Sequence, residues 1–228
     1  MARRARLCVP GRAHYVRQQA VHGQSMVLDD ADRRALKEAL AESARAQGVA
    51  IVAYALCDDA LHLLVVPPQP ESLGRMIQSV GRRHVVAFNR RHDRHGTLWA
   101  GRFQAAPIEE GEHLLLAMRR IDSLLDENQP WSSAPHRLGQ QRDPLLIDPP
   151  ELWALGNTPF ERELGYRALL AQGLPPGQSD RLDGAVRGGW AFGTPAFVAA
   201  IEQATGRAAA PRPRGRPRRP EPGTGSAK

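Results

Sequence analysis

The order of apolar and polar positions predicts strands and helices in the first part of the chain. Loose alternation over Ala13–Val21 is typical of a strand. Apolar residues at helical spacing then run from a cap at Asp29 or Asp30 to a stop at Gly48. Two apolar runs follow, VAIVAYAL and LHLLVV, and the residues Cys57–Ala60 join them. Short β-rich runs on either side of an acidic turn predict a hairpin.

The pattern continues with two more helices and an extended segment between them. The first of these helices is capped near Ser72, and the second spans Glu110 to Leu125. Between them, Leu98–Ile108 is expected to be extended chain, broken at Ala100-Gly101. The order strand, helix, strand, strand, helix, strand, helix predicts an α+β fold, with a ferredoxin-like antiparallel sheet and helices on one face.

Composition changes after Asp126, and the chain divides into four predicted parts. A core domain spans 1–127, and the stretch 128–150, rich in Pro, Gly and Gln, is a linker or wrapping loop. A small helical region spans 151–206, with one helix opened by a capping box at Thr158 and another by Thr194-Pro195. The last part, 207–228, is rich in Arg, Pro and Gly, and we expect it to be disordered when free.

Charge and cysteine usage favour a polyanionic partner and a reducing compartment. The formal net charge is +7 and the sequence pI is ≈ 10.3. Nearly all of the positive charge is arginine, which binds phosphate in bidentate fashion. Cys8 and Cys57 form no disulfide framework and match no zinc spacing. No apolar run reaches membrane-spanning length, and the first residues lack a signal peptide, so the expected location is cytoplasmic.

The segment Phe88–Phe103, FNRRHDRHGTLWAGRF, combines arginines with aromatic residues. Arginines neutralise phosphates, and aromatic rings stack on bases, so this mixture indicates a binder of single-stranded or hairpin nucleic acid. The alternative is a solvated helix end with Trp99 and Phe103 in the core. The candidate DNA-binding residues here are Arg82, Arg83, Arg90, Arg91, Arg94, Trp99, Arg102 and Phe103.

The tail contains a second candidate DNA-binding element. Arg214 and Arg216 flank a glycine between prolines, in a pattern similar to the core of an AT-hook. An extended Arg-Gly-Arg segment fits the narrow minor groove of A/T-rich DNA. The alternative is a basic tail that binds any polyanion.

The order of elements and five short segments resemble the single-tyrosine HUH transposases, and more closely their REP-associated tyrosine transposase branch in bacteria. These segments cover most of the chain in the family's order. They are Pro10-Gly11, YALCDDALHLLV, FNRRHDRHGTLWAGRF, Pro130-Trp131-Ser132-Ser133 and GWAFGTPAFVAAIEQATGR.

The resemblance implies a protein that cuts and rejoins single-stranded DNA at hairpin-forming sequences. In the family, two histidines on a central strand, separated by one hydrophobic residue, hold a divalent ion that polarises the scissile phosphate. Here the second histidine is His62, but the first position is Ala60, which cannot ligate a metal. Asp58 and Asp59 lie beside the gap, and carboxylates suit Mg²⁺ or Mn²⁺. Because strand neighbours point to opposite faces, Asp59 faces away from His62 unless the turn redirects it, and we expect His62 to bind no metal.

The family's nucleophile, a tyrosine on the third helix, is also replaced. The matching segment reads AMRRIDSLL, with Arg120 at the tyrosine position, and a guanidinium is no nucleophile. Tyr54 and Tyr166 are expected to be structural. Tyr15, on a strand beside that of His62, is the only substitute among the chain's three tyrosines. We therefore expect no strand transfer.

The leading hypothesis is a catalytically impaired protein of the transposase family that binds single-stranded or hairpin DNA. Arg119 and Arg120 would extend the basic surface into the old active site, where Arg120 could hold the phosphate that tyrosine once attacked. One alternative is an active enzyme that uses Tyr15 or rearranged ligands around His62. Another is an RNA-binding regulatory module, because structured RNA offers the same phosphates and unstacked bases.

Overall fold

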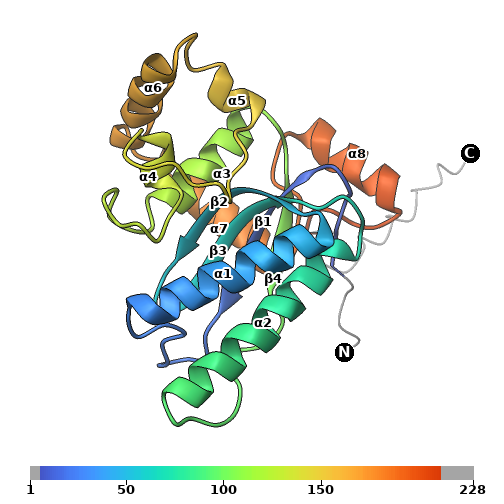
Figure 1. Ribbon diagram of the computed structural model, residues 1–228. Helices are drawn as coiled ribbons and strands as arrows, with labels where there is room; N and C mark the ends of the chain where they lie inside the picture. The colour runs from blue at the N-terminus through green and yellow to red at the C-terminus, as the bar shows by residue number, and fades with distance from the viewer. Residues whose placement is uncertain (1–5, 212–228) are drawn as a thin grey trace, which may run out of the picture.

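A four-stranded sheet with helices on both sides forms the centre of the molecule (Figure 1). The computed structural model describes residues 6–211. The core elements are β1 (Ala13–Gln19), α1 (Asp30–Gln47), β2 (Ala50–Leu56), β3 (Ala60–Val66), α2 (Ser72–Arg91), β4 (Gln104–Ile108) and α3 (Glu112–Asp122). This is the predicted order of elements.

The strands lie in the order β2-β3-β1-β4, and each neighbouring pair is antiparallel. The predicted α+β fold with a ferredoxin-like antiparallel sheet is therefore confirmed. The register on the two central strands places Arg17 of β1 opposite His62 of β3, and Tyr15 opposite Leu64. Because side chains alternate along a strand, Tyr15 and Arg17 share one face of β1, and Ala60 and His62 share one face of β3.

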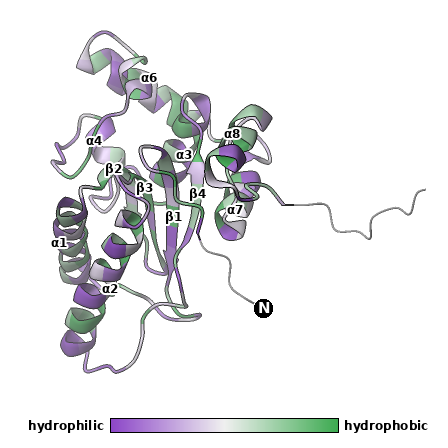
Figure 2. Cartoon of the chain, turned by 90° about the vertical axis from the view of Figure 1, so that its right-hand side faces the viewer, coloured by the Kyte–Doolittle hydropathy of each residue, from purple (hydrophilic) through white to green (hydrophobic). Residues whose placement is uncertain are grey.

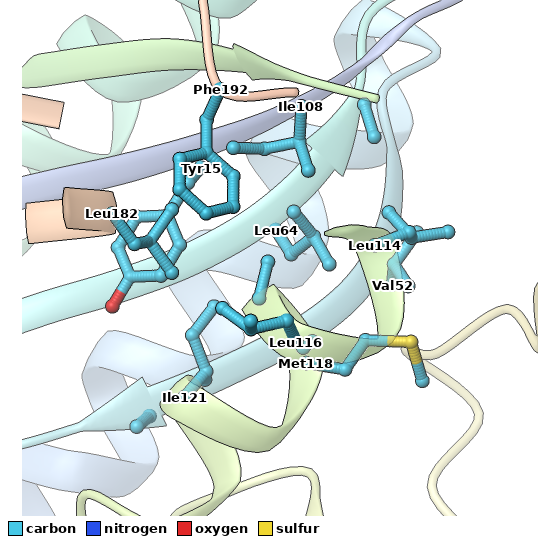
Figure 3. Close-up of a cluster of buried hydrophobic side chains, with 14 of the residues drawn as sticks. Tyr15, Val52, Leu64, Ile108, Leu114, Leu116, Met118, Ile121, Leu182 and Phe192 are labelled. Carbon is cyan, nitrogen blue, oxygen red and sulfur yellow. The ribbon is translucent and has the colours of Figure 1, made fainter. Parts of the chain in front are cut away.

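The predicted coverage by helices on one face needs correction, because helices cover both faces (Figure 2). Residues of α1 and α2 pack on one face, around Val16 and Leu63. Residues of α3 and of a later helix pack on the other face, around Tyr15 and Leu64 (Figure 3). A strand that is buried on one face only alternates apolar with polar residues, whereas β2 and β3 are unbroken apolar runs. Such runs indicate that both faces of the strand are buried.

Local signals fix the ends of α1, whereas the extended segment before α3 is shorter than expected. The Asp29 carboxylate accepts a hydrogen bond from the backbone N–H of Asp32 at 3.0 Å, and Gly48 ends the helix with φ 62°. Of the predicted extended stretch, only Gln104–Ile108 is strand β4. The part before it forms a loop, and its Trp99 makes an isolated bridge to Ala20 at the end of β1.

The segment after α3 wraps over the edge of the sheet and is held by a buried ion pair. It contains the short helices α4 (Ala134–Arg137) and α5 (Pro150–Trp153). Arg137 donates to the carboxylate of Asp122 at 2.6 Å, and both side chains are 0% exposed. The Tyr166 hydroxyl donates to the same carboxylate at 2.5 Å. The wrapping loop is thus part of the folded core.

Three further helices complete the described chain: α6 (Pro159–Ala171), α7 (Gln178–Gly188) and α8 (Pro195–Thr205). The predicted capping box of α6 is present, with Thr158 and Glu161 exchanging hydrogen bonds. The sequence analysis did not anticipate α7, which packs against β4 and β1 and buries Leu182 beside Tyr15 (Figure 3). Among residues 6–211, no helix is long and apolar enough to cross a membrane.

Candidate nucleic-acid interface

Residues from five helices and strands line a pocket of about 660 Å³ at one end of the central strands. We call it the central pocket. Its charged and polar walls come from β1, α1, β3, α3 and α7, from the turn between β2 and β3, and from the segment after α3. They include Arg17, Asp58, Asp59, His62, Arg120 and Asp183. The fold therefore brings Arg120 of α3 to His62 and the acidic turn, from which it is distant in the chain.

His62 lies at the base of the central pocket and is hydrogen-bonded to Tyr15. Its side chain is buried, and its Nδ1 and the Tyr15 hydroxyl share a hydrogen bond of 2.9 Å. Burial, together with the positive charges of Arg17 and Arg120, lowers the pKa of His62 to about 3, so the imidazole is neutral. Burial also raises the pKa of the Tyr15 phenol well above its ordinary value. A phenol without solvent exposure and with a raised pKa is a poor substitute nucleophile.

Arg120, at the end of α3, lines the pocket, and part of its guanidinium is hydrogen-bonded to a neighbouring carboxylate. Its Nη2 donates to Asp183 of α7 at 2.9 Å, and the two side chains are 21% and 30% exposed. Burial alone would lower the pKa of Arg120, but Asp183 outweighs it and the net shift is upward. The Nε atoms of Arg120 and Arg17 are buried and have no hydrogen-bond partner within residues 6–211. Two arginines, each with an unpartnered Nε donor, therefore border one pocket. Their positive charges make this pocket suitable for an anion.

The donor groups of this pocket do not fit a divalent cation. Asp58 forms an ion pair with Arg33. Asp59 and His62 both line the pocket, but they are not part of a group of three metal-ligating side chains within the described residues. No group of three His, Cys, Asp or Glu side chains within the described chain is placed to hold a metal ion. Two arginines on the pocket wall would also repel a cation. The resemblance-based possibility of a Mg²⁺ or Mn²⁺ site thus finds no matching ligand set in the arrangement of these residues.

The other two tyrosines are structural in their surroundings. Tyr54 is fully buried in β2 and donates to Asp143 at 2.7 Å. Tyr166 is fully buried in α6, where its hydroxyl meets Asp122. Burial raises the pKa of both phenols above the ordinary value.

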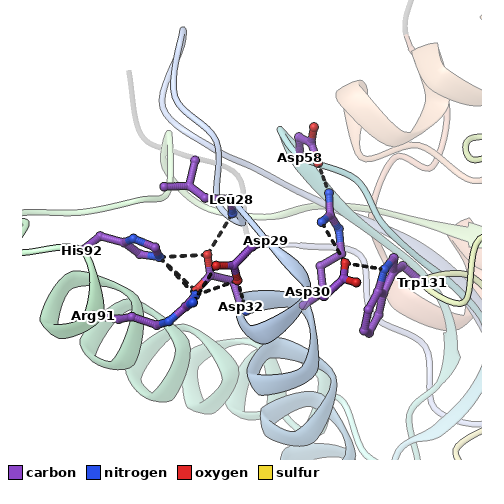
Figure 4. A network of polar contacts seen from close by, with 9 residues as sticks. Leu28, Asp29, Asp30, Asp32, Asp58, Arg91, His92 and Trp131 are labelled. Atoms are coloured by element: carbon purple, nitrogen blue, oxygen red, sulfur yellow. Dashed lines mark hydrogen bonds and ion pairs between the residues drawn. The ribbon is translucent and has the colours of Figure 1, made fainter.

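Arg91, one of the predicted DNA-binding residues, is committed to an internal ion-pair network (Figure 4). Its guanidinium donates to Asp29 at 2.5 Å and to Asp32 at 2.6 Å, and His92 lies 2.9 Å from Asp32. The acidic start of α1 meets the basic end of α2, as the two helix dipoles favour. Arg91 therefore joins two helices and does not offer a free charge to a ligand.

Other predicted DNA-binding residues also have internal partners. Arg83 pairs with Glu42, and Arg94 donates to Gln24 at 2.7 Å. Phe103 is 8% exposed, and the Arg6 guanidinium lies 3.5 Å from its ring centroid. Phe103 is thus a core residue, as the alternative reading of this segment had it, and its covered ring offers little surface for stacking.

The remaining members of the predicted set lie at the surface. Arg82 and Arg90 are exposed and make no ion pair within residues 6–211, and Arg102 is exposed beside Phe103. Trp99 is half-buried against His84 at a ring-centroid distance of 6.1 Å. Arg119 donates to the Gly173 carbonyl and does not line the central pocket. Arg214 and Arg216 lie outside the described residues.

Arg17 and Asp183 are among the pocket residues that sequence reasoning missed. Arg17 had a signal, because it lies two positions after Tyr15 on a strand and so faces the same side. Asp183 had none, since α7 was not expected and its contact with Arg120 spans 63 positions.

Comparisons with known proteins agree with this architecture. Residues 15–118 match the family model "Transposase IS200 like". No curated protein matches the chain. A solved structure described as the REP-associated tyrosine transposase bound to a REP hairpin is 13% identical, with a TM-score of 0.52, and the match covers 65% of this chain and 92% of that one. A putative transposase from Deinococcus radiodurans R1 is 22% identical with a TM-score of 0.37, over 48% of this chain and 88% of that one.

Proposed function

Through residues 15–118 this chain belongs to the IS200-like transposase family, and we propose that it binds single-stranded or hairpin DNA without cutting it. A DNA partner is supported by the solved transposase bound to a REP hairpin, which has the same fold. The basic composition, with a net charge of +7, supports a polyanionic ligand.

The burial of every tyrosine carries the proposal that this chain does not cut DNA. The chain has three tyrosines, and Tyr15, Tyr54 and Tyr166 are all 0% exposed. Each hydroxyl is hydrogen-bonded to a neighbouring side chain. A tyrosine that attacks a phosphodiester must reach its phosphorus, and none of these hydroxyls is accessible. The replacement of the family's tyrosine by Arg120 and of its first histidine by Ala60 agrees with this burial.

The central pocket then acts as a phosphate site. Arg17 and Arg120 line it, and a guanidinium binds a phosphate diester with two parallel hydrogen bonds. The neutral His62 adds no repulsion to a bound anion and no positive charge of its own. Binding energy in this pocket is electrostatic, so DNA affinity falls as salt rises.

The outer surface adds further contacts along the strand. Arg82 and Arg102 are exposed and line a cavity with Trp99, whose ring is partly exposed, and Arg90 is exposed further along α2. Arginines of this kind contact phosphates, and a tryptophan stacks on an unpaired base. Arg214 and Arg216 of the tail would add contacts in the minor groove of A/T-rich DNA.

The test uses the purified chain and a labelled DNA hairpin with single-stranded flanks, in buffer with Mg²⁺ or Mn²⁺. We expect a shifted band on a native gel and intact DNA on a denaturing gel. A covalent protein–DNA adduct would contradict the proposal, and preferential competition by the same hairpin in RNA would make RNA the ligand.

A matched pair of double variants tests the surface. Arg82→Gln with Arg90→Gln should weaken binding, because both residues lie on the proposed surface. Arg34→Gln with Arg45→Gln removes the same charge from exposed positions of α1 and should change binding less. Equal losses would mean that only the net charge of the protein matters.

A further inference from the structure

Two adjacent cavities lie between β1, α2 and the loop before β4, next to the central pocket. The first, the glutamine hollow, has a volume of about 420 Å³ and includes Arg17, Gln18, Gln19, Arg102 and Gln104 in its lining. The second, the tryptophan slot, has a volume of about 620 Å³. Its lining includes Ile77, Gly81, Val85, Val86, Trp99 and Phe103. One cavity is thus polar and the other mostly apolar.

The two cavities share part of their lining, and the glutamine hollow shares one residue with the central pocket. Gln18, Gly101 and Arg102 line both the glutamine hollow and the tryptophan slot. Arg17 lines both the glutamine hollow and the central pocket. A cavity lined by arginine and glutamine next to a mostly apolar one matches the two halves of a nucleotide, whose phosphate is charged and whose base has a flat π-face.

Buried polar atoms without partners gather around these cavities. Arg17 Nε, Gln104 Oε1 and Trp99 Nε1 are buried and have no hydrogen-bond partner in the described chain. Such groups are rare in folded proteins, because each loses its bond to water and gains none in return. Two of the three atoms are donors and one is an acceptor. A ligand with both acceptors and donors could satisfy them.

The apolar slot depends on a glycine of α2. A Cβ atom at Gly81 would lie 2.8 Å from Trp99 Nε1, so only glycine lets the indole lie this close to the helix. Backbone hydrogen bonds hold the loop that carries the indole, because the backbone N–H of Trp99 donates to Thr97 Oγ1 at 3.1 Å and that of Ala100 to the Gln19 carbonyl at 3.0 Å. Val86 is 68% exposed at the mouth of the slot. The aromatic surface is therefore held in place before any ligand binds.

We propose that this pair of cavities binds one unpaired nucleotide of the DNA flank. Its phosphate lies against Arg17 and Arg102 in the glutamine hollow, and its base enters the tryptophan slot and stacks on Trp99. The inference rests on the proposed function, and it adds the position where a single base is recognised, one step from the phosphate in the central pocket.

The experiment places the fluorescent base 2-aminopurine at each flank position of the hairpin in turn. Stacking on an indole quenches this base, so we expect one position to lose fluorescence on binding and the others to change little. Trp99→Ala should abolish the response at that position and weaken binding about five- to 150-fold, the range for one stacked base.

An abasic nucleotide at the responding position provides a test that does not depend on the folding of a variant. Removing the base should weaken binding of the unmodified protein and should have little further effect on Trp99→Ala. If the hairpin binds but no flank position responds, or if the abasic site costs both proteins equally, the nucleotide site is overturned and DNA binding stands. If no single-stranded or hairpin DNA binds, the proposed function fails and the nucleotide site with it.

Discussion

The ion pair between Arg120 and Asp183 leads to a sharp prediction about the central pocket. The Asp183 carboxylate occupies one edge of the Arg120 guanidinium at 2.9 Å, so a DNA phosphate must share or displace it. Asp183→Asn removes this competing charge and leaves a side chain of the same size. We therefore expect the Asp183→Asn variant to bind hairpin DNA more tightly, and Arg120→Gln to bind it more weakly.

The geometry sets the size of both effects. With side chains 21% and 30% exposed, the pair is partly screened by water, and its contribution is about 1 kcal/mol, near the upper end for surface pairs. Releasing it should tighten binding about fivefold. Loss of a charge-assisted hydrogen bond to phosphate costs about 1.5–3 kcal/mol, so Arg120→Gln should weaken binding roughly 10- to 150-fold. Its slope of log affinity against log salt should fall by about 0.7, the value for one phosphate on a single strand.

Fluorescence anisotropy of a labelled hairpin over a range of salt concentrations measures affinity and slope together. Asp180→Asn and Arg187→Gln are matched controls, because both residues are exposed on α7 and make no ion pair within residues 6–211. In the double variant, Asp183→Asn should give no gain, since its benefit acts through Arg120. The reasoning is refuted if Arg120→Gln keeps the affinity and salt slope of the unchanged protein, or if Asp183→Asn tightens binding equally without Arg120.

Three further predictions concern stability. Arg137→Ala leaves Asp122 as an unpaired buried charge and should lower the free energy of unfolding by about 3–5 kcal/mol in urea denaturation; a loss below 1 kcal/mol would contradict a buried pair. Burial would raise the pKa of Asp143, but hydrogen bonds to its carboxylate outweigh burial and lower the pKa below 3.8. The ionised Asp143 therefore stabilises the fold above pH 3.8, and this stabilisation is lost as the pH falls through the folded-state pKa. Unfolding titrations should show a shallower acid dependence for Asp143→Asn, and an unchanged slope would exclude this role. Thr158→Ala removes the N-cap of α6 and should cost about 1 kcal/mol, whereas Thr205→Ala, at the end of α8, is the comparison for loss of a hydroxyl.

The central elements could be predicted because their signals are local. Asp29 and Gly48 mark the ends of α1, and the capping box at Thr158 marks the start of α6. The apolar runs of β2 and β3 indicated a hairpin, and their lack of alternation also held the information that both faces are buried. The start of β4 was placed too early, because the loop before it bonds to the end of β1 through single contacts that leave no periodic pattern.

The sequence also singled out His62 and Arg120, and both line the central pocket. It could not identify their partners. Which arginines are free depends on carboxylates from distant segments: Asp29 and Asp32 neutralise Arg91, while Arg82 keeps an unpaired charge within the described chain.

The sequence by itself determined the order of the core elements, the basic character of the chain and the presence of only three tyrosines. The tertiary structure alone decided that all three tyrosines are buried, that Arg17 and Asp183 meet Arg120, and that unpaired polar atoms surround the cavities beside Trp99. The physical reason is the range of the interactions. Caps and periodicity act over a few residues, whereas burial and ion pairing depend on how the sheet register and helix docking bring distant side chains together.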